Sequence, residues 1–309
     1  MKFSFRQLEY FVAAGETGSV TRAAAGSHSS QPTVSAAIAK LERALGVQLF
    51  VRHHAQGLSL TPEGRRFLGE AKRLLGHAAE VERFASTLSD EIAGTLDLAC
   101  LVTLAPLVTP RLVREFTGAN PRVHVELVEG DQDALLERLR TGVSSVALTY
   151  DLQLPTEIAF EPLVDLPPRA MLPAGHRLAL RKRVDLSELR TEPHILLDLP
   201  ISRDYFMSLF TAAGVEPTIG ARSEHPETIR TMVANNFGYA IVNARPRIDT
   251  ALDGGKLVTV PLRGDPRPMR LGLASPRGIR ETRTVTAFKE HCRRTITPAG
   301  VPGMLGPEE

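Results

Sequence analysis

Helix-start and helix-stop signals follow one another closely in the first fifty residues, and they predict short helices over 5–14, 20–25 and 31–45. Glycines end the first and third helices, and serines cap the second and third: Gly15, Gly18, Ser19, Ser30 and Gly46. Pro32 suits the first turn of the third helix, where a backbone N–H is not needed. Because a tight turn separates the last two helices, we expect a helix-turn-helix.

The third predicted helix is amphipathic, and a hairpin follows it. Its apolar positions recur at steps of four, three and four residues: Val34, Ile38, Leu41 and Leu45. Residues 47–51 and 58–60 then have the pattern of two short strands, joined by a loop over 52–57. Three short helices followed by such a wing predict an all-α winged helix-turn-helix, whose third helix enters a groove of duplex DNA.

The polar face of this helix and the wing carry groups suited to DNA. The candidates are Arg22, Ser30, Gln31, Pro32, Thr33, Ser35, Lys40, Arg52 and His53. Short polar side chains can bond base edges, a helix N-terminus attracts a phosphate, and cations can reach phosphates or a minor groove. A merely solvated face is the commoner outcome for an isolated helix. The ordered caps, turn and wing favour DNA binding.

The charge of the chain is divided unevenly. Residues 1–88 contain 11 Lys and Arg against 7 Asp and Glu, a net charge of +4, and residues 89–309 contain 26 against 28, a net charge of −2. A basic front on a slightly acidic body is expected when one end meets a polyanion. A chance fluctuation of a few charges produces the same asymmetry.

A fourth helix is predicted over 61–89, because Thr61, Pro62 and Glu63 form a helix start. Its apolar positions alternate steps of four and three residues: Phe67, Ala71, Leu74, Ala78, Val81, Ala85 and Leu88. This seam predicts a dimerisation helix, since two heads can then address two half-sites of DNA. The alternative is an amphipathic helix that lies on its own domain.

From residue 90 onward, strand and helix patterns alternate. Strands are expected over 96–101, 123–128 and 146–150, with helices over 104–116 and 131–140 between them. This order predicts a parallel sheet with right-handed crossovers. A second α/β set is expected over 194–199, 203–213, 225–235, 239–242, 257–262, 269–274 and 282–294. With crossings near 162–168 and 264–268, the body is predicted to be a hinged two-lobed binder.

The run RQLEYFVAAGETGSVTRAAAGSHSSQPTVSAAIAKLERALGVQLFVRH, followed by LSLTPEG, resembles the N-terminal domain of LysR-type transcriptional regulators. The resemblance is specific over roughly the first 65 residues and extends, more loosely, to about Arg294. It implies a periplasmic-binding-protein-like effector domain, a small-molecule effector, a dimer or tetramer, and it admits RNA polymerase as a partner. Ala36 and Ala37 depart from the family, which often has basic or amide residues there, so base readout is expected to be thinner.

The patterns and the resemblance together predict a winged helix-turn-helix at 1–60, a dimerisation linker helix at 61–89 and an effector-binding domain at 90–296. Lobe 1 is expected over 90–163 and 265–296, and lobe 2 over 164–264. The tail 297–309 is rich in proline and glycine, and we expect it to be flexible.

A ligand in such a fold lies at the carboxyl ends of the strands, beside helix N-termini. The residues expected there are Thr103, Gly130, Thr149, Asp151, Ser202, Arg203 and His225. Hydroxyls at helix N-termini suit an organic anion, and Arg203 can pair with it. Ordinary capping by Thr103 and Ser202 is the alternative, and His225 before a proline can be a plain loop residue.

The sequence has no GxSxG, phosphate-loop, HExxH or CxxC motif, so it predicts no catalytic site, metal or cofactor. Cys100 and Cys292 are too few for a disulfide framework and fit a reducing cytoplasm. An α/β enzyme, or a redox sensor acting through Cys100, remains as the alternative, although a buried cysteine usually serves packing. With no signal-peptide pattern and no long apolar stretch, no membrane association is expected.

Overall fold

The computed structural model describes residues 3–27, 29–53, 57–86 and 92–306, except for the side chains at 52, 53, 79, 80 and 82–86. The chain forms two compact units, one of residues 1–85 with 141–143 and the other of 86–140 with 144–309. Each unit has its own apolar core.

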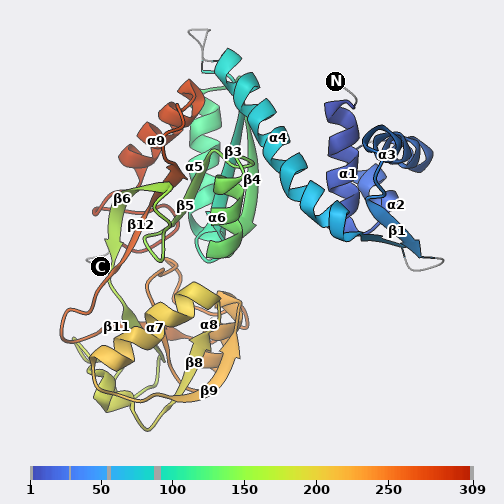
Figure 1. Cartoon of the computed structure of the whole chain (residues 1–309). Helices are drawn as coiled ribbons and strands as arrows, with labels where there is room; N and C mark the ends of the chain where they lie inside the picture. Colours follow the sequence, from blue (N-terminus) through green and yellow to red (C-terminus); the bar gives the residue numbers. More distant parts are fainter. Residues whose placement is uncertain (1–2, 28, 54–56, 87–91, 307–309) are drawn as a thin grey trace. The chain divides into compact units, whose positions relative to one another are not determined.

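The N-terminal unit contains the helices and the hairpin that the sequence predicts (Figure 1). Its elements are α1 (Phe5–Thr17), α2 (Val20–Gly26), α3 (Gln31–Leu45), β1 (Phe50–His53), β2 (Gly57–Leu60) and α4 (Pro62–Ser86). Ser4 and Gln7 form a capping box at the start of α1. Gly18 and Gly46 end α1 and α3 with positive φ angles of 61° and 68°, a conformation that favours glycine. The winged helix-turn-helix is confirmed.

The apolar face of α4 is shared between this core and solvent. Phe67 lies 5.3 Å, centroid to centroid, from Phe11, and Ala71 is only 2% exposed. Leu74 and Val81, further along the predicted seam, are 38% and 68% exposed. The start of the seam therefore lies on its own domain, and only its later positions remain for a partner. Leu88 and the side chain of Ala85 lie outside the described residues.

Lobe 1 of the C-terminal unit is built on a sheet of strand order β4-β3-β5-β12-β6 (Figure 1). Its elements are β3 (Gly94–Leu101), α5 (Ala105–Ala119), β4 (Val123–Gly130), α6 (Gln132–Arg140), β5 (Val146–Tyr150), β6 (Ile158–Leu166), β12 (Met269–Pro276) and α9 (Arg283–Thr295). Strand β3 is parallel to β4 and β5, as predicted, whereas β12 runs antiparallel to β5 and β6.

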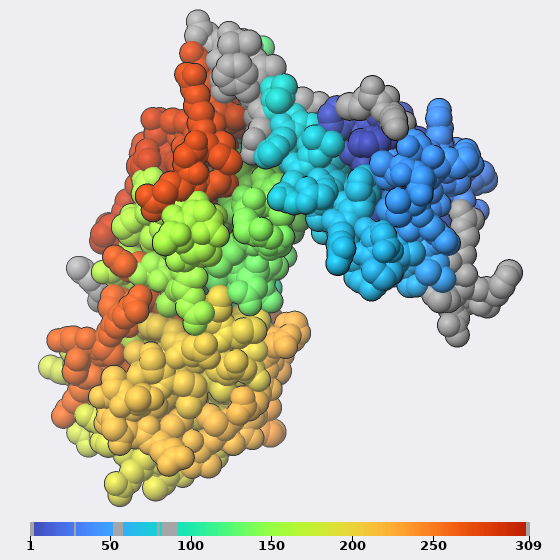
Figure 2. Space-filling model, viewed as in Figure 1, coloured from blue at the N-terminus to red at the C-terminus, as the bar shows by residue number. Residues whose placement is uncertain are grey.

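Lobe 2 repeats this plan. It comprises β7 (Arg169–Pro173), η1 (Leu186–Leu189), β8 (Pro193–Leu197), α7 (Pro200–Ala212), β9 (Thr218–Ser223), α8 (Pro226–Ala234), β10 (Ala240–Val242) and β11 (Leu257–Pro261). The β8-β9 pair is parallel, and β10-β7-β11 is antiparallel. A bridge between His194 and Tyr239 joins them in the order β9-β8-β10-β7-β11. Figure 2 shows this lobe in yellow and orange, beside the green and red of lobe 1.

The chain crosses between the lobes after β6 and again before β12. Apolar side chains of both lobes form one continuous core cluster, which includes Leu98 and Phe116 of lobe 1 and Leu196 and Phe210 of lobe 2. The two lobes are thus packed together over part of their surface.

Strands β6, β7 and β9 are absent from the sequence prediction. Pro162 lies inside β6, and an interior proline ordinarily argues against a strand because it donates no ladder hydrogen bond. In the structure Pro162 pairs with Gly272 where the register of β12 shifts, so a β-bulge accommodates it.

The prediction of a flexible tail is wrong for residues 297–306. Val301 and Met304 are 1% and 0% exposed and belong to the core cluster. Thr297 and Gly300 form a backbone bridge, and Met304 forms another with Pro246. The proline- and glycine-rich segment is therefore held in place by buried side chains and backbone bridges. Residues 307–309 lie outside the described residues.

Candidate functional site

The first turn of α3 presents polar groups to solvent. Gln31, Pro32 and Thr33 are exposed, as is Lys40 further along the helix, and Ser35 is half-buried. Val34, Ile38 and Leu41 face the core on the opposite side. Ser30 caps the helix: its Oγ accepts from the Thr33 N–H at 3.3 Å and lies 2.7 Å from Thr33 Oγ1. Capping therefore occupies part of the hydrogen-bonding capacity of Ser30 and Thr33.

Side chains on the neighbouring elements hold α3 in place. Arg6 Nε donates to Tyr10 Oη at 2.9 Å, and Tyr10 Oη lies 2.8 Å from Ser29 Oγ, in the turn before α3. At the other end of α3, Glu42 Oε1 accepts from the N–H groups of Leu49 and Phe50 at 2.8 and 3.1 Å. These bonds tie the turn, the helix and the start of the wing into one rigid element.

The remaining predicted DNA-binding residues flank α3. Arg22 is exposed on α2, and its guanidinium donates to the Thr17 carbonyl. Arg52 and His53 belong to β1, but their side chains lie outside the description, as does all of His54.

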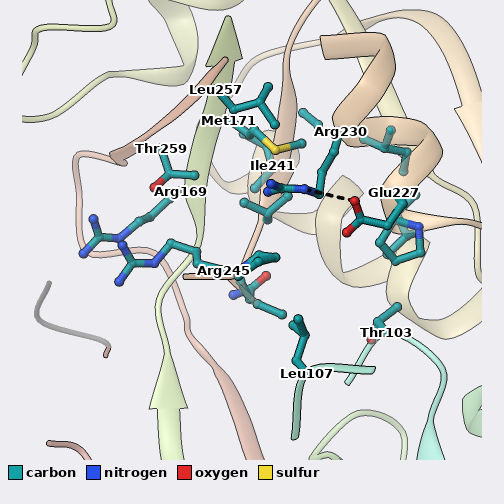
Figure 3. Close-up of a pocket in the computed structure, with 18 of the residues that line it drawn as sticks. Thr103, Leu107, Arg169, Met171, Glu227, Arg230, Ile241, Arg245, Leu257 and Thr259 are labelled. Atoms are coloured by element: carbon teal, nitrogen blue, oxygen red, sulfur yellow. Dashed lines mark ion pairs between the residues drawn. The ribbon is translucent and has the colours of Figure 1, made fainter. Parts of the chain in front are cut away.

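A cavity of about 360 Å³ opens in the C-terminal unit and is lined from both lobes. Lobe 1 contributes Val102 and Thr103, which lie between β3 and α5, and Leu107 of α5. Lobe 2 contributes most of the wall, from β7, α8, β10, β11 and the loop after β10 (Figure 3). Its apolar wall includes Leu107, Met171, Phe206, Ile241 and Leu257. Such a mixture of apolar walls with a few polar groups is typical of a small-molecule site.

Arginine is the main charged residue of this cavity. The described lining residues include four arginines and two acidic residues. Arg169, Arg230 and Arg245 are only 8%, 6% and 5% exposed. Burial lowers the pKa of Arg169, although an arginine keeps its proton in proteins. Figure 3 shows Arg169 and Arg245 extending to one side of the cavity, away from Arg230.

The two acidic residues of the lining, Glu227 and Asp249, make different ion pairs. Arg230 Nε lies 3.3 Å from Glu227 Oε2, an ion pair whose geometry is not that of a hydrogen bond, and its Nη2 donates to the carbonyls of Ile248 and Thr250 at 2.9 and 3.0 Å. Asp249 instead pairs with Lys256, at 3.2 Å. Guanidinium groups bind carboxylates through charge-assisted hydrogen bonds, so this wall can hold a negatively charged group.

Several helices begin at the cavity without a side-chain cap. The N-caps of α5, α7 and α8 are Leu104, Leu199 and His225, and none of them makes a side-chain capping hydrogen bond. Pro106, Ser202 and Pro226, in the first turns, line the cavity. Uncapped N–H groups and the helix dipole both favour an anion.

Asn243 adds a hydrogen-bonding group to the cavity wall. Its Nδ2 donates to the Leu166 carbonyl at 2.6 Å and to Tyr205 Oη at 3.1 Å, which fixes the orientation of the amide. Within the described part of the chain, its buried Oδ1 has no hydrogen-bond partner. This atom suits a donor group on a ligand.

Known protein families match both parts of the chain. Residues 5–65 match the family described as bacterial regulatory helix-turn-helix protein, lysR family, and residues 89–297 match the LysR substrate binding domain. The chain belongs to the LysR family. It is therefore a transcriptional regulator with a DNA-binding helix-turn-helix and an effector domain.

Relatives of the LysR family resemble this chain over most of its length. It is 28% identical to the transcriptional activator protein LysR of Escherichia coli (strain K12) over 303 residues, 98% of this chain and 94% of that protein. It is 30% identical to a hydrogen peroxide-inducible genes activator of Dickeya chrysanthemi over 240 residues, 77% and 78% of the two chains. The crystal structure of HinK, a LysR family regulator from Pseudomonas aeruginosa, is 37% identical, with a TM-score of 0.64 and coverage of 96% and 99%.

Of the effector residues predicted for this LysR-family chain, Thr103 and Ser202 line the cavity. Neither acts as a helix N-cap: Thr103 precedes the N-cap Leu104, and Ser202 lies inside α7. The alternative of ordinary capping therefore does not explain them.

The other predicted effector residues lie elsewhere: Gly130, Thr149, Asp151, Arg203 and His225 are not among the cavity-lining residues. Thr149 is fully buried and donates to Gln132. Asp151 pairs with Arg270 at 2.6 Å, and Arg203 pairs with Asp198 at 3.1 Å. Arg203 was expected to meet the anion, but this ion pair holds it outside the cavity.

Sequence reasoning missed Arg169, Arg230, Asn243 and Arg245. A signal existed for two of them. Arg169 begins the otherwise apolar run RAMLP, in which every residue is buried. Arg230 lies beside Ile229 on the buried face of α8. A charged residue inside an apolar pattern indicates a buried cation with a specific partner. No comparable pattern surrounds Asn243 or Arg245, which lie in the loop after β10.

Cys100 does not have the environment of a redox sensor. It lies in β3 with none of its surface exposed, and burial raises its pKa far above the ordinary value of a thiol. A reactive cysteine is instead partly exposed with a lowered pKa. Among the described residues there is no cluster of metal-ligating side chains, and no helix is long and apolar enough to span a membrane.

Proposed function

We propose that a small organic anion, bound between the two lobes, controls the regulatory activity of this protein. The observation that carries the proposal is the set of buried arginines in the cavity wall, Arg169, Arg230 and Arg245. A carboxylate or similar group would bind these guanidinium groups through charge-assisted hydrogen bonds. The uncapped starts of α5, α7 and α8 support the same sign of charge.

The cavity also limits the rest of the effector. Its apolar side chains, Met171, Phe206, Ile241 and Leu257 among them, favour an apolar body next to the anionic group. Asn243 Oδ1 favours a hydroxyl or amide N–H on that body. We therefore propose an aromatic or branched aliphatic acid rather than a fully polar metabolite.

On the DNA side, the first turn of α3 is proposed to read base edges through Gln31, Pro32, Thr33 and Ser35 in the major groove. Phosphate contacts are assigned to Arg22, Ser30, Lys40, Arg52 and His53. The exposed later positions of α4, Leu74 and Val81, are assigned to a partner copy of the chain in a dimer. Effector binding would shift the closure of the lobes and, through the dimer, the spacing of the two heads. Assembly as a tetramer, contact with RNA polymerase and a cytoplasmic location stay predictions.

The test of DNA binding uses the full chain and the DNA upstream of its own gene, measured by fluorescence anisotropy at several salt concentrations. Binding tighter than to random duplex, and weakening steeply with salt, is expected. Gln31→Ala should reduce the discrimination by about 1–3 kcal/mol. Gln153→Ala, an exposed glutamine of the other unit, is the control and should change nothing. Equal affinity for upstream and random DNA, with and without candidate acids, would refute the proposal.

A further inference from the structure

Residues 297–306, here named the C-terminal strap, follow α9 of lobe 1 and pass along the loop after β10 in lobe 2. The Leu305 N–H donates to the Arg245 carbonyl at 2.9 Å, and the Arg247 N–H donates to the Gly303 carbonyl at 3.3 Å. The side chains of the same two arginines also bond the strap: Arg247 Nε donates to the Met304 carbonyl at 3.1 Å, and Arg245 Nη2 donates to the Gly306 carbonyl. The strap is thus paired with lobe 2 through both backbone and side chains.

The same strap lies against lobe 1. Gly303 has a φ of +69°, and a Cβ atom on it would lie 2.1 Å from the Leu107 carbonyl oxygen in α5. Only glycine fits so close a backbone approach. Val301 and Met304 are buried in the core cluster shared by the two lobes. The strap therefore contacts both lobes at the place where they meet.

The strap also forms part of the cavity wall. Leu305 lines the cavity, together with Leu107 of lobe 1 and Arg245 and Arg247 of lobe 2. These are the residues that the strap contacts on either side. Docking of the strap and the shape of the cavity are therefore linked, because the strap positions cationic and apolar groups of the same wall.

We propose that the C-terminal strap is a specificity element of the effector site: Leu305 limits the size of the bound acid, and the docked strap holds Arg245 where the anionic group binds. This inference rests on the proposed function of the cavity. An effector that touches Leu305 and Arg245 meets both only while the strap is docked. By thermodynamic linkage, the effector then stabilises docking, and docking raises the affinity for the effector by the same factor.

The docking itself is tested without a ligand. Gly303→Ala places a Cβ against the Leu107 carbonyl and should displace the strap. Gly278→Ala is the matched control, since Gly278 has a φ of +80° but no atom within 4 Å of the added Cβ. Hydrogen exchange followed by mass spectrometry should show protection of the Leu305 and Arg247 amides at least tenfold lower in Gly303→Ala than in Gly278→Ala. Equal protection in the two variants would overturn the proposal.

A second comparison removes the last three residues only. A chain that ends at Gly306 keeps the whole strap, so its exchange pattern should match that of the full chain. If this truncation alone exposed the Leu305 and Arg247 amides, docking would not be a property of residues 297–306, and the proposal would fail.

The size limit is tested with benzoate and 1-naphthoate as probes, by isothermal titration of the full chain. Leu305→Ala should shift the ratio of the two affinities at least fivefold in favour of 1-naphthoate. Leu154→Ala, a half-buried leucine of lobe 1 outside the cavity lining, should leave the ratio as in the unmodified chain. An unchanged ratio in Leu305→Ala would refute the size limit.

The two proposals fail in different ways. If neither acid binds the unmodified chain while amides and amines do, the anionic effector is wrong, and the exchange comparison still decides whether the strap docks. If the acids bind but the Gly303→Ala variant binds them as tightly as Gly278→Ala does, the effector site stands and the strap has no part in it.

Discussion

The two lobes of the effector domain share a strand plan but differ in the chemistry they bring to the cavity. Lobe 1 has the order β4-β3-β5-β12-β6, and lobe 2 has the corresponding order β9-β8-β10-β7-β11. Lobe 1 contributes mainly apolar groups and hydroxyls, such as Leu107 and Thr103, whereas Arg169, Arg230 and Arg245 all come from lobe 2. The lobes therefore share a strand plan, but the buried arginines of the cavity wall all belong to lobe 2.

The largest effect is expected from the core that the two lobes share. Phe116 in lobe 1 and Phe210 in lobe 2 are each about 1% exposed and belong to the same core cluster. Phe116→Ala and Phe210→Ala should each lower the free energy of unfolding by about 3–5 kcal/mol. Because the core is continuous, calorimetry should show both variants shifting one shared transition of this domain. Phe237→Ala, 60% exposed, is the control and should change little. Two separately shifted transitions would contradict a shared core.

Acid should destabilise lobe 2 through His194. Burial lowers the pKa of His194 to about 4, against 6.5 for an ordinary histidine. The unfolded chain therefore binds the proton more readily, so the stabilisation is complete above about pH 6.5 and is lost as the pH falls toward 4. The expected loss is about 3 kcal/mol over that interval. His194→Phe should flatten the dependence of unfolding free energy on pH. A slope equal to that of the unmodified chain would show that His194 is not the group responsible.

Removing one cavity arginine of lobe 2 tests whether its charge contributes to ligand binding. Arg169→Met should weaken binding of a carboxylate by about 1.5–3 kcal/mol, the range for a hydrogen bond to a charged group. Arg203→Met in the same lobe is the control, because Arg203 pairs with Asp198 outside the cavity and should not affect binding. Isothermal titration of both variants measures the difference. Equal losses would mean that general surface charge attracts the ligand.

The smallest effect is expected in lobe 1. Thr103→Val keeps the shape of a residue that lines the cavity and removes its hydroxyl. The loss of carboxylate affinity should be about 0.5–1.5 kcal/mol, as for one neutral hydrogen bond. Titration of this variant beside Arg169→Met checks the order. If Thr103→Val lost more carboxylate affinity than Arg169→Met, lobe 1 rather than lobe 2 would contribute the main contact to the carboxylate.

The sequence was sufficient for the helix-turn-helix because its determinants are local. Caps such as Ser19 and Ser30 and stops such as Gly46 act within a turn of the helix they define. Strands of lobe 1 such as β5, in which every residue is buried, could also be predicted from their apolar runs. β6 was not, because Pro162 contradicts the local pattern and is accommodated only by a bulge formed with a distant strand.

Two of the residues predicted for an effector site line the cavity, but its charged residues were not predicted. The rule that ligands lie at strand ends found Thr103 and Ser202. It also selected Arg203, which faces Asp198, because ion pairing is decided by tertiary packing. Arg245 and Leu305 are 60 positions apart in the sequence and come together only because the strap packs against the loop after β10. No local sequence pattern predicts such a contact, and the proline- and glycine-rich composition of the strap instead predicted a flexible tail.

The most direct test of the account compares one carboxylic acid with its amide and its amine. The thermal unfolding midpoint of the full chain is measured with benzoate, benzamide and benzylamine at equal concentrations, and again for the Arg169→Met variant. Benzoate should raise the midpoint more than the other two, by preferential binding to the folded state, and this advantage should be lost in Arg169→Met. A larger rise with benzylamine or benzamide, or an undiminished response to benzoate in Arg169→Met, would contradict this prediction.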